Sequence, residues 1–218
     1  MALHVLRLWV PDRPGALGAV ASRIGAVRGD LVGIEILERG AGRAIDELVI
    51  DLPDPELVDL LVAEVSEVDG VDVEDVRRVD DGLVDPRLDA LDTAAELVAR
   101  DAVSHLLDGF ASACERDFRA DWVAVTTPGA GDPQVTVGPA PEGSWLNAFL
   151  IGSEASPAAG DGGPHDVAWA RLQSSGLAVV AGRDGRPWHL KERRQLEALA
   201  RIVDARWTEL STRVATAP

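Results

Sequence analysis

The sequence has few of the residues on which several kinds of function depend. Cys114 is the only cysteine among 218 residues, so the chain can form neither an internal disulfide nor a metal site built from several thiolates. Only 21 lysines and arginines stand against 37 aspartates and glutamates, which gives a formal net charge of −16. A chain this acidic repels the phosphates of nucleic acids and of anionic lipids, so we expect neither as a partner.

Long apolar runs are also missing. The apolar run at the N-terminus ends within a few residues at Pro11 and Asp12, which is too short for a signal peptide. No stretch approaches the ~20 apolar residues of a membrane span. Together with the single cysteine, these features predict a cytoplasmic protein. Hydrophobic residues nevertheless make up 46% of the chain, which is enough for a packed core in one large domain or two small ones.

The first part of the chain alternates between the periods of strands and helices. Apolar residues recur at helical spacing after Gly15 and again after Pro55, and the segments around them are rich in β-forming residues. We predict the order strand, helix, strand, strand, helix, strand over residues 3–10, 15–27, 31–38, 45–52, 57–68 and 71–79. Such a unit closes as a four-stranded antiparallel sheet with both helices on one face, a ferredoxin-like α+β fold.

A charged segment that contains Gly82 and Pro86 follows this unit. We expect it to be a linker, over 81–91, between a first domain at 1–80 and a second at 92–212. The second domain is predicted to be α+β as well, with long flanking helices at 93–113 and 189–210. Between these helices we predict short strands at 122–127, 134–137, 167–172 and 177–181, and an apolar segment at 145–151.

The turn Asp12-Arg13-Pro14-Gly15 joins the first predicted strand to the first helix. A residue before proline avoids the helical region, so Pro14 is expected at the first helical position. The N–H groups of Gly15 and of the next two residues would then lack intrahelical acceptors and would favour a carboxylate. The alternative is that Asp12 caps the helix itself and Gly15 only permits a tight turn.

DRPGAL at this turn and GIEI in the second strand, within the βαββαβ order, resemble an ACT domain. ACT domains are small regulatory modules that bind amino acids beside metabolic enzymes and transcription factors, and the resemblance covers roughly residues 1–80. It implies a ligand held where the first turn meets the second strand of a partner subunit. The residues that would form this site are Asp12, Arg13, Pro14, Gly15, Ala16, Leu17, Gly33, Ile34 and Glu35. Many amino-acid-binding members have an asparagine or a similar polar residue at the position of Gly33, so this chain departs from the family there.

The end of the chain resembles a different family. GLAVVAGRDGRPW followed by HLKERRQLEALARIVDAR is similar to the closing strand and helix of a GAF-type sensor domain, and the resemblance covers roughly residues 92–210. Some members attach a bilin through a cysteine, but Cys114 falls in or just after the opening helix, which argues against that chemistry. We therefore predict a divergent GAF-like domain and no cofactor.

Candidate catalytic and metal-binding groups are sparse. Asp101, His105 and Asp108 share one face of a predicted helix, but such side chains are more often simply solvated than metal-bound, so no metal site is predicted. RGAGR at 39–43 joins two strands and lacks a following helix, so it does not support dinucleotide binding. Most of the six tryptophans are expected in the core, although Trp145 and Trp188 flank loops and could line a pocket. No catalytic set is evident, so we do not expect an enzyme.

The second strand is expected at an edge of its sheet. Between Leu31 and Glu38 it carries Val32, Ile34 and Ile36, and an apolar edge of this kind favours pairing with a second copy. We therefore predict a homodimer in which each ligand site is shared between subunits. The favoured function is that of a non-enzymatic sensor of a small molecule, an amino acid in the first instance. The alternative is a protein-interaction or dimerisation module without a small-molecule ligand.

Overall fold

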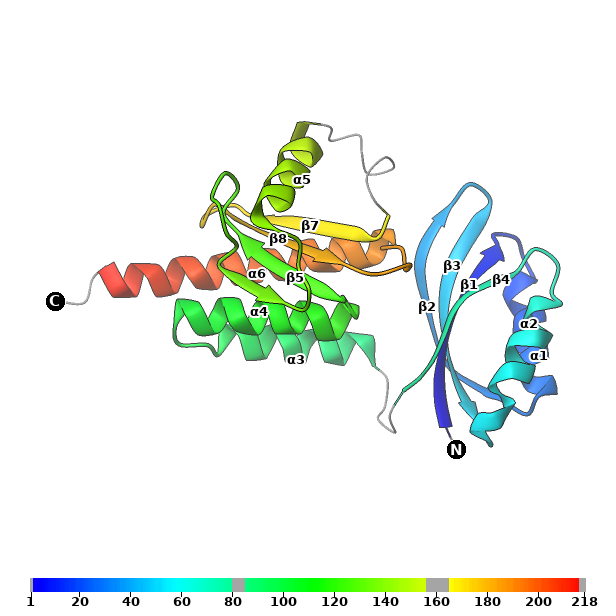
Figure 1. Cartoon of the computed structure of the whole chain (residues 1–218). Helices are drawn as coiled ribbons and strands as arrows, with labels where there is room; N and C mark the ends of the chain where they lie inside the picture. Colours follow the sequence, from blue (N-terminus) through cyan, green and yellow to red (C-terminus); the bar gives the residue numbers. More distant parts are fainter. Residues whose placement is uncertain (1, 80–84, 156–164, 216–218) are drawn as a thin grey trace. The chain divides into compact units, whose positions relative to one another are not determined.

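The computed structural model describes residues 2–79, 85–155 and 165–215. The chain divides into two compact units, Met1–Asp85 and Pro86–Pro218, each containing one four-stranded antiparallel sheet (Figure 1). Both units are mixed α+β, as the sequence predicted. None of the helices in the described ranges combines the length and apolar character that crossing a membrane requires.

The first unit follows the predicted order. Its elements are β1 (Ala2–Pro11), α1 (Ala16–Ala26), β2 (Asp30–Gly40), β3 (Arg43–Leu52), the 3₁₀ turn η1 (Pro55–Leu57), α2 (Val58–Ser66) and β4 (Asp72–Arg78). The strands are ordered β2-β3-β1-β4, and α1 and α2 cover the same face of this sheet (Figure 1). This is the ferredoxin-like arrangement expected of a split βαβ unit.

One face of the sheet and the two helices form the core of the first unit. Alternate residues of the central strands, including Leu8 of β1 and Leu48 of β3, point toward the helices and are fully buried. Val20 and Ile24 of α1 lie one turn apart and pack on them. The strand order leaves β2 bonded only to β3, so β2 is an edge of the sheet.

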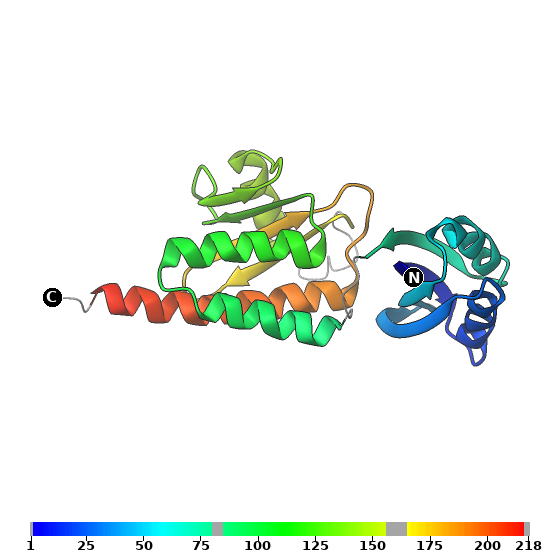
Figure 2. The same ribbon diagram turned by 90° about the horizontal axis from the view of Figure 1, so that it is seen from below.

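The second unit is built around the sheet β6-β5-β8-β7. Its elements are α3 (Pro86–Val98), α4 (Val103–Phe118), β5 (Trp122–Thr126), β6 (Val135–Val137), α5 (Gly143–Ala155), β7 (Val167–Leu172), β8 (Leu177–Gly182) and α6 (Leu190–Ala215). Helices α4 and α6 pack on one face of the sheet, and α5 lies on the other (Figures 1 and 2). The larger core is therefore the one on the side of α4 and α6.

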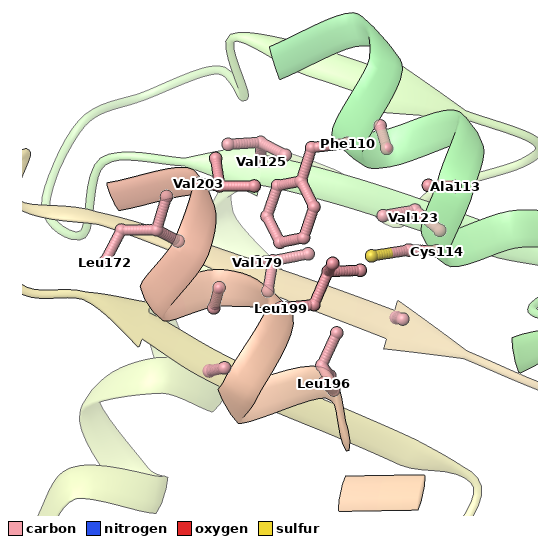
Figure 3. Close-up of a cluster of buried hydrophobic side chains, with 14 of the residues drawn as sticks. Phe110, Ala113, Cys114, Val123, Val125, Leu172, Val179, Leu196, Leu199 and Val203 are labelled. Atoms are coloured by element: carbon pink, nitrogen blue, oxygen red, sulfur yellow. The ribbon is translucent and has the colours of Figure 1, made fainter. Parts of the chain in front are cut away.

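Figure 3 shows part of this larger core. Phe110 and Cys114 of α4 point toward Leu199 of α6 and the sheet, and Phe110 and Cys114 are fully buried. Burial raises the pKa of the Cys114 thiol far above its ordinary value, so this thiol is protonated at neutral pH. Cys114 therefore acts as a small core residue.

The start of the second unit differs from the prediction. The helix expected at 93–113 is two helices, α3 and α4, separated at Ala102, whose φ of −132° is extended. Arg206 of α6 donates two hydrogen bonds, of 3.1 and 2.7 Å, to the Arg100 carbonyl that the break leaves without an intrahelical donor. This tertiary contact favours the break and cannot be seen in local periodicity.

The structure also revises the predicted linker and the predicted apolar segment of the second unit. The linker was expected over 81–91, but α3 begins at Pro86, where proline suits the first turn of a helix; positions 81–84 lie outside the described residues. The apolar segment at 145–151 belongs to α5, whose Leu146 and Leu150 are one turn apart and fully buried.

Candidate functional site

The turn between β1 and α1 contains more residues than the sequence predicted. Pro14 lies in the turn, and α1 begins at Ala16. Gly15 occupies the N-cap position with φ of +89°, a left-handed conformation that glycine adopts at little cost. Pro14 was predicted as the first helical residue, and that prediction is wrong because the left-handed Gly15 separates it from the helix.

The backbone N–H groups without an acceptor are therefore not the ones that the sequence predicted. Ala16, which was predicted to be unpaired, donates its N–H to the Arg13 carbonyl at 3.3 Å. The first bond of the helix runs from the Ala19 N–H to the Gly15 carbonyl at 3.0 Å. In the part of the chain that the structure describes, the N–H groups of Leu17 and Gly18 have no acceptor. These two groups are the donors at the positive end of the α1 dipole.

Asp12 does not cap α1. No side chain accepts a hydrogen bond at the N-cap of this helix. The Asp12 N–H donates to the Gly42 carbonyl at 2.9 Å, and the Asp12 carboxylate lies 4.0 Å from the guanidinium of Arg39. The capping alternative raised by the sequence therefore does not describe this turn, and the donors of α1 remain available.

The turn is open to an approaching molecule. The four residues from Asp12 to Gly15 are exposed. A Cβ built on Gly15 or on Gly18 meets no atom within 4 Å, so the space beside these two Cα atoms is open. A small anion could therefore reach the donors of Leu17 and Gly18.

The edge strand places one predicted residue on the same face as α1. Ile34 of β2 lies opposite Leu48 in the ladder, so both side chains are on the helix-bearing face. Leu48 is fully buried, whereas Ile34 is 50% exposed, because β2 extends beyond the cover of the helices. Val32 and Ile36 are also exposed, so the edge carries three uncovered apolar side chains.

The other two predicted residues of β2 lie on the opposite face. Glu35 is paired with Glu47, and Gly33 is paired with Val49, next to a bulge at Val32. A Cβ at Gly33 would lie only 3.2 Å from a methyl group of Val49, so a side chain at this position would crowd Val49. The structure thus brings Ile34, and neither Gly33 nor Glu35, to the face that carries α1.

A buried carboxylate that sequence reasoning missed lies on this face. Asp46 of β3 is paired with Leu8 on one side and with Ile36 on the other, and only 4% of its surface is exposed. Its Oδ1 is buried without a hydrogen-bond partner. Burial raises the pKa of Asp46; the nearby Arg39 guanidinium opposes this rise and the Asp12 carboxylate adds to it. Asp12 belongs to the turn, and Arg39 of β2 lies beside it.

A signal for Asp46 was present in the sequence. Ala44, Leu48, Ile50 and Leu52 alternate along β3 and all point to the core. Asp46 interrupts this series at a position where a charged residue is expensive. A charged residue in the buried register of a central strand is therefore the pattern that could have identified it.

A group of polar side chains lies at the start of α4 and just before it. Asp101 and His105 are joined by a hydrogen bond of 3.1 Å, which lowers the pKa of the Asp101 carboxyl. A shallow hollow of about 300 Å³ lies between α3 and α4 and is lined by Glu96, Leu97, Arg100, His105, Asp108, Gly109, Ser112 and Arg116. Among the described residues, no group of three or more metal-ligating side chains converges here or elsewhere.

The RDGRPW segment holds a buried ion pair. Arg183 donates two hydrogen bonds to the Glu192 carboxylate, at 3.1 and 2.8 Å, and a further one to the Phe118 carbonyl. Its guanidinium also lies 3.9 Å from the ring centroid of Trp188. Trp188 was expected to be able to line a pocket, but it is buried by this stacking. These partners fix the connection between β8 and α6.

Trp145 remains accessible. Its side chain is exposed on α5, stacks on Phe149 with a centroid separation of 5.3 Å, and meets the edge of the Trp122 ring. This aromatic group lies on the side of the sheet opposite α4 and α6.

No protein-family model and no curated protein matches the sequence. Similar solved structures include the ACT domain of a GTP pyrophosphokinase of Chlorobium tepidum, at 19% identity and a TM-score of 0.30, covering 36% of this chain and 100% of that domain. A formyltetrahydrofolate deformylase from Pseudomonas putida KT2440 is 16% identical with a TM-score of 0.31, covering 41% of this chain and 36% of the deformylase. An unknown protein from Galdieria sulphuraria is 10% identical with a TM-score of 0.33, covering 84% of this chain and 98% of that one.

These likenesses are too low to assign the chain to a family. The ferredoxin-like fold of the first unit rests on its own strand order and on the placement of α1 and α2. The GAF-like interpretation of the second unit stays a prediction.

Proposed function

We propose that the first unit is a regulatory module that binds a small molecule carrying a carboxylate, with an amino acid as the expected ligand. The observation that carries this proposal is the pair of unpartnered N–H groups, on Leu17 and Gly18, beneath an open turn. A carboxylate at the N-terminus of a helix is favoured by about 0.3–1 kcal/mol at the surface, and by up to ~2 kcal/mol when partly buried.

Asp46 supports an amino acid over a simple carboxylic acid. Its buried carboxylate has an oxygen without a partner, and a buried charge of this kind is stabilised by a cation. The turn offers donors to the carboxylate of a zwitterion, and Asp46 offers an acceptor to its ammonium group. Arg39 and Asp12, which act electrostatically on Asp46, would adjust the local charge around such a ligand.

We further propose that the site is completed by a second copy of the chain. The β2 edge can pair with its own copy in antiparallel fashion, which makes a continuous sheet about a two-fold axis. Covering the exposed halves of Val32, Ile34 and Ile36 would contribute roughly 1 kcal/mol each. The turn of one subunit would then face Ile34 of its partner.

The second unit is proposed to respond to the ligand rather than to catalyse a reaction. Its β8–α6 segment, which has the resemblance to GAF-type domains, is fixed by the Arg183–Glu192 pair. A GAF-like sensor or interaction domain joined to a ligand-dependent dimer would pass on a change in subunit geometry.

The alternative is that the first unit only dimerises. The exposed apolar edge of β2 would support pairing without any ligand, so this observation by itself does not distinguish the two functions.

A thermal-shift screen of the full chain against the twenty amino acids distinguishes the sensor from the dimerisation module. A sensor should gain several degrees in Tm with one or a few amino acids, because a ligand that binds only the folded state stabilises it. The 2-oxo acid corresponding to the best amino acid should give a smaller gain, since it lacks the ammonium group. If no amino acid raises Tm while sedimentation shows an intact dimer, the interaction module is the correct function.

A further inference from the structure

Helix α3 has two apolar sides. On the inner side Thr93 and Leu97 are buried, and α3 packs against α4 and α6 (Figure 2). The Thr93 hydroxyl donates to the Asp117 carboxylate at 2.7 Å and accepts a hydrogen bond from Arg116, which ties the inner side to α4. The inner side is thus sufficient to hold α3 in the second unit.

The outer side carries apolar residues that nothing in the described structure covers. Leu88, Leu91 and Val98 are 50%, 67% and 49% exposed, and Ala95 is exposed between them. The steps along this row are three, four and three residues, which is the spacing of the seam of a two-stranded coiled coil. At 100° per residue the row lies almost opposite Thr93 and Leu97, so the seam points away from α4 and α6. An ordinary solvent-facing side of a helix would be polar.

The charges beside the seam favour a second copy in parallel orientation. Arg87 precedes Leu88 on one flank, and Asp92 follows Leu91 on the other. In a parallel pair, a residue that directly precedes a seam position, as Arg87 does, lies near the residue five positions later on the other helix. Arg87 of each subunit would therefore lie near Asp92 of the partner subunit, twice by symmetry. An antiparallel pair would instead place Arg87 near the other end of α3, at Val98, and away from Asp92 of the partner subunit.

We propose that α3 pairs in parallel and in register with α3 of a second copy, through the seam formed by Leu88, Leu91, Ala95 and Val98. A two-fold axis along the seam places each of these residues against its own counterpart. This contact is separate from the β2 edge and does not depend on a ligand.

Cysteine cross-linking of the full chain tests the pairing and its direction. Cys114 is fully buried, so the unaltered chain provides a baseline without an accessible thiol. Under mild oxidation, Leu88→Cys and Val98→Cys should each form disulfide-linked dimers with themselves. The matched control is Glu96→Cys, an exposed position on the flank of α3 near Arg116 of α4, which should not cross-link in the same time.

Two results would overturn the proposal. In an antiparallel pair the two Leu88→Cys sites would lie about 15 Å apart along the axis, so only a mixture of Leu88→Cys and Val98→Cys chains would cross-link. If neither variant alone nor the mixture cross-links, the seam is covered by something other than a second α3.

Sedimentation of the full chain provides a second measurement. Leu91→Glu should weaken dimerisation at least tenfold, whereas Leu60→Glu, at an exposed leucine of α2, should leave it unchanged. Equal dissociation constants for the two variants would contradict a pairing through α3.

Discussion

Ile34 and Leu48 lie opposite one another in the ladder of β2 and β3, yet Leu48 is fully buried and half of Ile34 is exposed. The two side chains lie on the same face of the sheet and on adjacent strands. Helices α1 and α2 therefore cover this face as far as Leu48 but leave much of Ile34 exposed. An uncovered isoleucine on an edge strand is a place where a second sheet can be added. The proposed dimer and the shared ligand site both depend on this boundary.

The two residues should respond differently to substitution. Ile34→Asp should weaken dimerisation at least about tenfold, or ~1.4 kcal/mol, while the subunit stays folded. Leu48→Ala should instead lower the free energy of unfolding by about 2–5 kcal/mol, because it leaves a cavity in the core. Sedimentation and urea unfolding measure the two effects; a dimer that survives Ile34→Asp unchanged would exclude the β2 edge as an interface.

Asp46→Asn should make the stability of the protein depend less on pH. The folded-state pKa of Asp46 is raised by burial, so its contribution to stability is fully present below the unfolded pKa of about 3.9 and is lost as the pH rises through the folded pKa. The asparagine variant should therefore be more stable than the natural protein at pH 7, and this advantage should vanish in acid. Urea unfolding between pH 3 and pH 8 checks this, and a variant that is less stable at pH 7 would refute it.

The buried pair of Arg183 and Glu192 should be sensitive to the loss of one partner. Glu192→Gln should destabilise the second unit by about 3–5 kcal/mol, since it leaves a buried guanidinium without its counter-charge. The double variant Arg183→Met, Glu192→Met should recover much of that loss, because it removes both charges. A single variant as stable as the natural protein would show that water reaches the pair.

Gly18→Ala should stabilise the first unit by about 0.5–1 kcal/mol. Gly18 lies in the first turn of α1, and an added Cβ meets no atom within 4 Å. Alanine restricts the unfolded chain and suits a helix better than glycine does. Thermal unfolding measures the gain, and a loss of stability would indicate that the space above Gly18 is occupied.

Much of the fold could be predicted from the sequence because its signals are local. The alternation of β1 and β3 and the stripes of Val20 and Ile24 are properties of short segments, and they gave the element order of the first unit. The break between α3 and α4 could not be predicted in this way, because Arg206, which is 106 positions later, donates hydrogen bonds to the carbonyl of Arg100.

The site was only partly accessible to the same reasoning. The sequence indicated an open helix start near Gly15, but it placed the helix two residues too early because Pro14 suits a first helical position. Which face of β2 each residue occupies depends on the bulge at Val32 and on the register with β3, which separated Ile34 from Gly33 and Glu35. Asp46 was missed because its carboxylate can be recognised as buried only when the buried face of β3 is known.

The measurement that tests the central claim most directly is titration of the full chain and two variants of Gly15 with the best amino acid of the screen. Gly15 has a φ of +89°, and asparagine and aspartate impose similar strain there, so they differ mainly in charge. Gly15→Asn should retain binding within a few-fold, and Gly15→Asp should abolish it, because a carboxylate at the start of α1 competes with that of the ligand. Equal affinities of the two variants would contradict a carboxylate-binding site at this turn.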